Sequence, residues 1–93
     1  MQLGDLIARF EDEAVAEEAL LNLDDLALTA RIHDACARKG MTLGEFASGA
    51  VQQFSSTASD EEWVTVIGQM GQSAEPGLIL LHRSLVWQLA RDS

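Results

Sequence analysis

Local signals that begin and end helices divide this chain into short segments, and they constrain its fold more than any other feature. Thr42 with Glu45, and Ser59 with Glu62, form two capping-box patterns. In such a box, the hydroxyl and the carboxylate satisfy backbone N–H groups that the first turn of a helix leaves without partners. Gly40 precedes the first box and can adopt the left-handed conformation that ends many helices. These signals predict several short α-helices joined by tight turns.

Apolar residues recur at steps of three and four between these signals, which is the spacing of an amphipathic helix. The one proline, Pro76, stands where a first helical residue would. A chain of 93 residues can build one hydrophobic core. We therefore expect a single all-α domain over residues 1–93, a compact bundle of four to five short helices. The expected helices span residues 3–21 with a break near Glu11 and Asp12, 25–39, 43–54, a short segment after Ser59, and 77–91, with a polar connection at 55–58.

The last expected helix is apolar on most of its sides. Its apolar residues are Leu78, Ile79, Leu80, Leu81, Leu85, Val86, Trp87 and Leu89. Such a helix is either central to its own core or covered by a partner chain, and a short chain has little surface with which to cover it. We therefore expect a homodimer, with Trp63, Leu80 and Trp87 as partner-binding residues, because aromatic anchors are typical of interfaces. The alternative is that both tryptophans belong to the core.

Negative charge is concentrated at the start of the chain. The net charge is −9, and residues 1–25 hold eight carboxylates against the single cation Arg9. A field of this sign repels nucleic acid and anionic lipid, and it attracts basic proteins. We expect a basic protein partner at this acidic N-terminal segment and no nucleic-acid partner. The alternative is a solvated acidic face with no partner.

The chain carries no signal for a membrane or for secretion. No apolar run approaches the roughly 18 residues of a membrane span, and the first residues lack the basic and then apolar order of a signal peptide. Cys36 is the only cysteine, which excludes an internal disulfide. We therefore expect a cytoplasmic protein that does not enter a membrane.

His33 and Cys36 are the one pair of residues that could bind a metal or act as a thiol and its base and that also lie at helical spacing. They lie three positions apart and so share a helix face, as two metal ligands or a thiol and its base would. A metal site needs further ligands, and the only other histidine, His82, lies in another segment. No glycine-rich phosphate loop occurs. We expect no catalytic residues, no metal and no cofactor, and a role in binding another protein as a regulator or adaptor.

Residues 20–54 resemble the ribbon-helix-helix family of small dimeric DNA-binding proteins. The resemblance rests on a helix closed by Arg38-Lys39-Gly40, on the turn over residues 40–46, and on a second helix that ends at Phe54. It implies a short strand at residues 20–23 that pairs with a second subunit in the major groove. It also implies that backbone N–H groups near Thr42 and Leu43 bind a DNA phosphate.

The strand implied at residues 20–23 differs in polarity from the strands with which the family contacts DNA bases. It offers Asn22 among leucines, and acidic residues flank it on both sides. These carboxylates would repel DNA at the groove. A DNA-binding transcriptional regulator is therefore the alternative to the protein-binding function.

Overall fold

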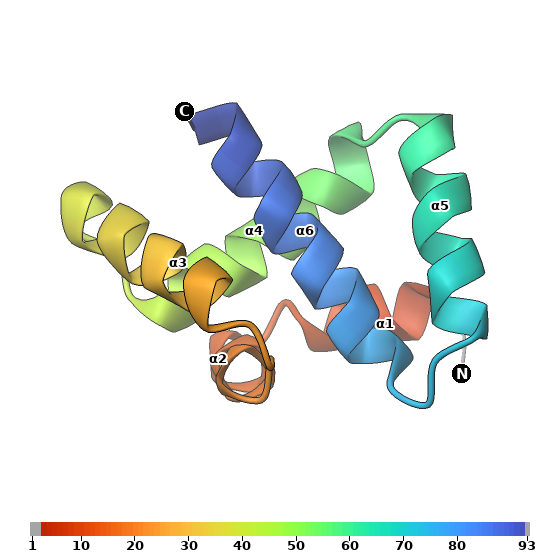
Figure 1. Cartoon of the computed structure of the whole chain (residues 1–93), viewed down its shortest axis with the longest axis horizontal. Helices are drawn as coiled ribbons and strands as arrows, with labels where there is room; N and C mark the ends of the chain where they lie inside the picture. Colours follow the sequence, from red (N-terminus) through yellow and green to blue (C-terminus); the bar gives the residue numbers. More distant parts are fainter. Residues whose placement is uncertain (1–2, 93) are drawn as a thin grey trace.

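Six α-helices follow one another in the computed structural model, which describes residues 3–92 and has no strand in that range (Figure 1). The predicted all-α class is confirmed, while the expected count of four to five helices is wrong. The helices are α1 (Leu3–Arg9), α2 (Glu13–Leu21), α3 (Leu26–Lys39), α4 (Leu43–Thr57), α5 (Asp60–Gly71) and α6 (Pro76–Asp92).

The expected break within residues 3–21 separates α1 from α2. The backbone of Asp12 is extended, and its carboxylate accepts hydrogen bonds from the N–H groups of Ala14 at 2.9 Å and Val15 at 3.4 Å. Asp12 thus acts as the N-cap of a new helix. This cap accounts for the additional helix.

Both capping boxes form, and they start α4 and α5 as predicted. In the first box, Thr42 N–H donates to Glu45 at 2.8 Å and Glu45 N–H donates to the Thr42 hydroxyl at 3.0 Å. Ser59 and Glu62 repeat the arrangement. Gly40 ends α3 with φ of 66°, the left-handed conformation that residues with a Cβ seldom adopt.

The prediction of a polar connection at residues 55–58 is wrong for residues 55–57, because α4 continues to Thr57. The hydroxyls of Ser55 and Ser56 donate to the carbonyl of Gln52 at 2.9 and 2.8 Å. Serine hydroxyls that bond back to the preceding turn remain compatible with a helix. The helix therefore ends one turn later than its apolar stripe.

Helix α6 lies at the centre of the molecule and runs diagonally across α4 (Figure 1). It contacts α2, α3, α4 and α5, which together bury Leu80, Leu81, Leu85 and Leu89. The chain therefore covers most of this helix by itself. Of the two alternatives for an apolar helix, the central position in its own core accounts for these buried leucines, and the homodimer stays a prediction.

One face of α4 holds the segment that contains α1 and α2. A Cβ at Gly44 would lie 2.7 Å from the carbonyl oxygen of Glu13, so only glycine fits there. One and two turns later, the Ser48 hydroxyl donates to the Phe10 carbonyl at 2.6 Å, and the Gln52 amide donates to the Ile7 carbonyl at 3.1 Å. These side chains satisfy carbonyls at the end of α1 that no helical N–H reaches. No helix among the described residues is long and apolar enough to cross a membrane.

We expect Gly44→Ala to lower the free energy of unfolding by about 1–3 kcal/mol, because the added methyl group collides with the backbone of α2. Gly49→Ala is the matched control on the same helix, since its methyl group meets no atom within 4 Å. The control should stabilise the chain by about 0.5–1 kcal/mol through its helix propensity. Urea unfolding followed by circular dichroism measures both effects, and equal effects at the two positions would contradict the close contact.

Candidate protein-interaction surface

The two tryptophans predicted to bind a partner lie in an aromatic cluster within the chain. The ring of Phe54 lies 5.1 Å from that of Trp63 and 5.6 Å from that of Trp87, both in edge-to-face geometry. The guanidinium of Arg91 stacks 4.6 Å above the Trp87 ring. Both tryptophans remain partly exposed and pack against the core. The cluster thereby joins α4, α5 and α6.

Leu80, the third predicted partner-binding residue, is completely buried within its own chain. A fully buried side chain has no surface with which to contact a partner. The reason is its place on α6, on the side that packs into the core. Burial could not be assigned from the sequence, because α6 is apolar on several sides.

Helix α5 carries apolar residues that the core does not use. Val64 is 71% exposed and Ile67 is 52% exposed, whereas Val66 is the residue of this helix that the core buries. The helical repeat places Gly68 and Gly71 beside Val64 and Ile67, and a Cβ at either glycine would meet nothing within 4 Å. We call these four residues the apolar flank of α5.

Exposed carboxylates cover α1, α2 and the two connections that follow them. This acidic surface consists of Asp5, Glu11, Asp12, Glu13, Glu17, Glu18 and Asp24. Arg9 is the only cation on these helices, and none of the carboxylates forms an ion pair with another described residue. The charge asymmetry predicted from the sequence therefore lies on two short helices that both pack against α4.

A cleft of about 390 Å³ opens between α1, α2 and the start of α6, beside the acidic surface. Its apolar wall includes Phe10, Val15 and Leu78, and the charged residues Arg9, Glu18 and Glu75 also line it. Two exposed leucines flank the nearby connection between α2 and α3. Leu21 is 65% exposed and Leu26 is 87% exposed. The surface thus combines negative charge with apolar area that the chain leaves uncovered.

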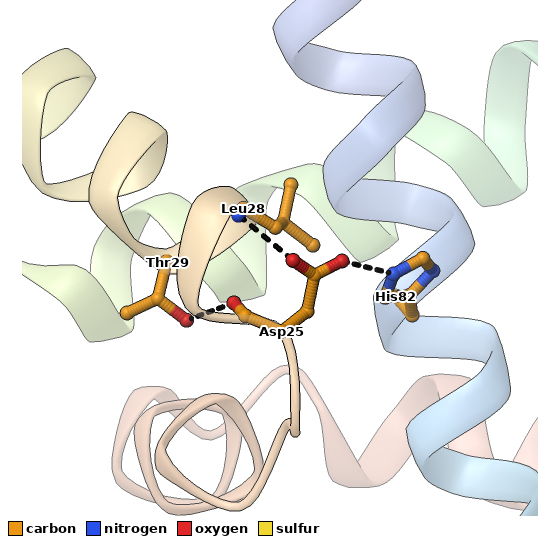
Figure 2. A network of polar contacts seen from close by, with 4 residues as sticks. All are labelled: Asp25, Leu28, Thr29 and His82. Atoms are coloured by element: carbon orange, nitrogen blue, oxygen red, sulfur yellow. Dashed lines mark hydrogen bonds and ion pairs between the residues drawn. The ribbon is translucent and has the colours of Figure 1, made fainter.

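A polar network ties the start of α3 to α6 (Figure 2). One carboxylate oxygen of Asp25 accepts the N–H of Leu28 at 3.0 Å, and the other lies 3.1 Å from Nε2 of His82. The Thr29 hydroxyl donates to the Asp25 carbonyl at 2.9 Å. The Leu28 N–H and, to a smaller degree, His82 hold the pKa of Asp25 below its ordinary value. The network caps α3 and binds it to α6.

Sequence reasoning placed Asp25 inside the expected helix 25–39, so it missed both the N-cap role of this residue and its contact with His82. The two residues are 57 positions apart, and no local pattern links them. The contact could be found only from the tertiary structure, which places His82 of α6 beside the start of α3. Both side chains remain more than a third exposed.

His33 and Cys36 share a helix, but the structure does not bring them together in one site. His33 is exposed, whereas Cys36 is buried and its thiol donates to the Thr42 carbonyl at 3.7 Å. Burial raises the pKa of the Cys36 thiol, which disfavours the reactive thiolate. Among residues 3–92, no group of three or more His, Cys, Asp and Glu side chains could hold a metal ion.

The strand implied by the ribbon-helix-helix resemblance does not form. Leu20 and Leu21 are the last residues of α2, and Asn22 and Leu23 belong to the connection after it. The helix, tight turn and second helix of the resemblance are present as α3 and α4. The N–H of Thr42 already donates to the Glu45 carboxylate. A phosphate would have to displace that carboxylate.

No family model, curated protein or solved structure matches this chain significantly. Its membership of the ribbon-helix-helix family stays a prediction.

The Asp25 carboxylate stabilises the fold only while it is ionised, because its pKa in the folded chain lies below the ordinary 3.8. Its contribution is complete above that pH and is lost as the pH falls below it. We expect Asp25→Asn, which retains an acceptor for Leu28, to be less stable than the wild type at pH 7. This difference should shrink progressively as the pH falls below the ordinary value of 3.8.

Urea unfolding across this pH range measures the difference, and Asp24→Asn is the control with the same charge change on an exposed neighbour. An Asp25→Asn deficit that persists unchanged at pH 2 would show that its charge is not the cause.

Proposed function

We propose that this chain acts by binding a basic segment of another protein on its acidic surface. The observation that supports this function is the set of exposed carboxylates on α1, α2 and their connections, with Arg9 as the only cation among them. Complementary charge steers association and selects partners. The cleft and the exposed Leu21 and Leu26 supply apolar area for short-range contact. The cytoplasmic location and the lack of catalysis stay predictions.

The helix dipole accounts for some of the exposed carboxylates but not for Glu17 and Glu18. Acidic residues favour the first turn of a helix, where Glu13 and the three acids of α5 lie. Glu17 and Glu18 lie past the first turn of α2, where the dipole gives a carboxylate no advantage. Glutamate is a good helix former, but so is uncharged glutamine, so helix propensity does not require the negative charge. The charge of these two residues therefore supports a binding role.

A peptide of ten lysines is a suitable probe for this proposal. We expect the double variant Glu17→Gln, Glu18→Gln to bind it roughly twofold to tenfold more weakly, since each exposed charge contact contributes up to about 1 kcal/mol. Raising the salt concentration should remove most of the difference. Fluorescence anisotropy of the labelled peptide measures both effects.

The matched control is Asp60→Asn, Glu61→Gln, which makes the same charge change in the first turn of α5. Equal weakening by the control and by the α2 variant would mean that net charge alone, and not the acidic surface, governs binding.

Self-association is a second candidate, supported by the apolar flank of α5. A two-fold axis between positions 67 and 68 would place Val64 opposite Gly71 and Ile67 opposite Gly68 of the second copy. Each branched side chain would then meet a glycine, which lets two helices approach closely. The interface is self-complementary, as a symmetric dimer requires. In this antiparallel arrangement, the acidic first turns of the two α5 helices lie at opposite ends.

We expect light scattering during size-exclusion chromatography to give twice the 10.1 kDa of one chain at high micromolar concentration. Val64→Gln, Ile67→Gln should give the monomer mass, because polar side chains no longer gain from mutual burial. Thr65→Gln, on the polar side of α5, is the control and should leave the dimer intact. A wild-type monomer at this concentration would refute self-association and leave the binding of basic partners unaffected.

A further inference from the structure

Two adjoining clefts form a groove along the first turns of α6. The cleft of about 390 Å³ beside the acidic surface adjoins one of about 250 Å³, which opens between the α2–α3 connection, the α5–α6 connection and α6. Asn22, Glu75 and Leu78 line both clefts. We call the two clefts together the α6 groove. A ligand that fills the α6 groove has two neighbouring hollows to occupy.

Apolar side chains line each of the two clefts. Phe10 and Val15 line the first, Leu23 and Ile79 line the second, and Leu78 lines both. Leu78 is half-buried, but unlike the other four residues it neither belongs to the hydrophobic core nor packs against it. The apolar surface of Leu78 is therefore available to a ligand.

The charged side chains along the α6 groove are mostly carboxylates. Glu18, Asp24 and Glu75 are exposed, and none of them forms an ion pair with another residue in the range 3–92. Arg9 lines the first cleft and is the one arginine or lysine of the groove. Such a groove repels anionic lipid and a second copy of this chain, whose net charge is −9. It attracts a basic segment.

Three further polar side chains line the α6 groove, and each already takes part in a hydrogen bond within the chain. The Asn22 amide donates to the carbonyl of Glu18 at 3.1 Å, and the Ser73 hydroxyl accepts an N–H of its own connection at 3.0 Å. His82 is held by the carboxylate of Asp25 (Figure 2). The groove therefore offers few groups that could pair with the backbone of an extended peptide.

The form of the partner follows from this shortage of pairing groups. Extended peptides commonly bind by adding a strand to the edge of a sheet, and residues 3–92 contain no strand. A helix satisfies its own backbone N–H and C=O groups, so it needs only apolar and charged contacts from a groove. The α6 groove supplies both kinds of contact.

We propose that the α6 groove binds one face of a basic amphipathic helix. This inference rests on the proposed function and names the form of the basic segment. Apolar residues of the partner, three or four positions apart on one helix face, enter the two clefts and meet Leu78 between them. Lysines and arginines beside these residues pair with Glu18, Asp24 and Glu75.

Two peptides of the same composition, eight lysines and four leucines, test the form of the partner. In the face peptide the leucines lie on one side of a helix, and in the spread peptide they are distributed around it. We expect the face peptide to bind about tenfold more tightly, because only it places leucines in the groove while its lysines reach the carboxylates. Fluorescence anisotropy of the labelled peptides measures both affinities.

Equal affinity of the two peptides would overturn the amphipathic helix. It would leave the proposed function standing, because the peptide of ten lysines tests the binding of basic segments separately.

Leu78→Gln removes the apolar residue that the two clefts share. Glutamine is a good helix former and Leu78 lies outside the core, so we expect circular dichroism to show a folded variant. The advantage of the face peptide should fall to about twofold or less, while the peptide of ten lysines binds nearly as before. Val86→Gln is the matched control, since Val86 is an exposed apolar residue of the same helix outside the groove. The control should keep the full advantage.

Arg9→Gln provides a second test that does not alter the apolar wall. Removal of this cation should tighten binding of the face peptide about twofold to threefold, and more than Arg31→Gln, which makes the same charge change on the exposed side of α3. Equal tightening by the two variants, or an unchanged advantage of the face peptide in Leu78→Gln, would overturn the proposal. Loss of wild-type self-association in Leu78→Gln would also overturn it, because a second copy would then occupy the groove.

Discussion

The contact between α4 and the α1–α2 segment is the interaction on which the arrangement of the surfaces depends. Gly44 admits the backbone of α2, and Ser48 and Gln52 donate to carbonyls at the end of α1. An unsatisfied buried carbonyl costs free energy, so these bonds make the break between α1 and α2 compatible with packing. Because α1 and α2 both pack against α4, their carboxylates remain on the outer sides of the two helices, exposed to solvent.

The central position of α6 brings it to clefts at opposite ends of the helix. Its first turns border the cleft beside the acidic surface, and its last turn contributes Arg91 to a separate cleft, which Lys39 also lines. Cations at helix ends are expected, since they complement the dipole, and Lys39 and Arg91 both lie in last turns. This separate cleft therefore lies where the ends of α3 and α6 converge on α4.

Local features of the fold were predictable because their causes lie within three or four residues. Both capping boxes, the end of α3 at Gly40 and the break at Asp12 follow from side chains that bond to nearby backbone groups. The candidate site was predictable only as a charge asymmetry. Leu80 was assigned to a partner because α6 is apolar on several sides, and the pattern does not reveal which side faces the core. The sequence likewise does not distinguish the exposed Val64 and Ile67 from the buried Val66 of the same helix.

The sequence by itself determined the helical class, the starts of the main helices and the concentration of negative charge near the N-terminus. These properties depend on propensity, capping and composition, which act along the chain. Only the tertiary structure decided that α6 is covered by its own chain, that Asp25 meets His82 and that Lys39 and Arg91 line one cleft. Each of these depends on contacts between residues far apart in sequence. Such contacts depend on how the helices pack together, which no local pattern specifies.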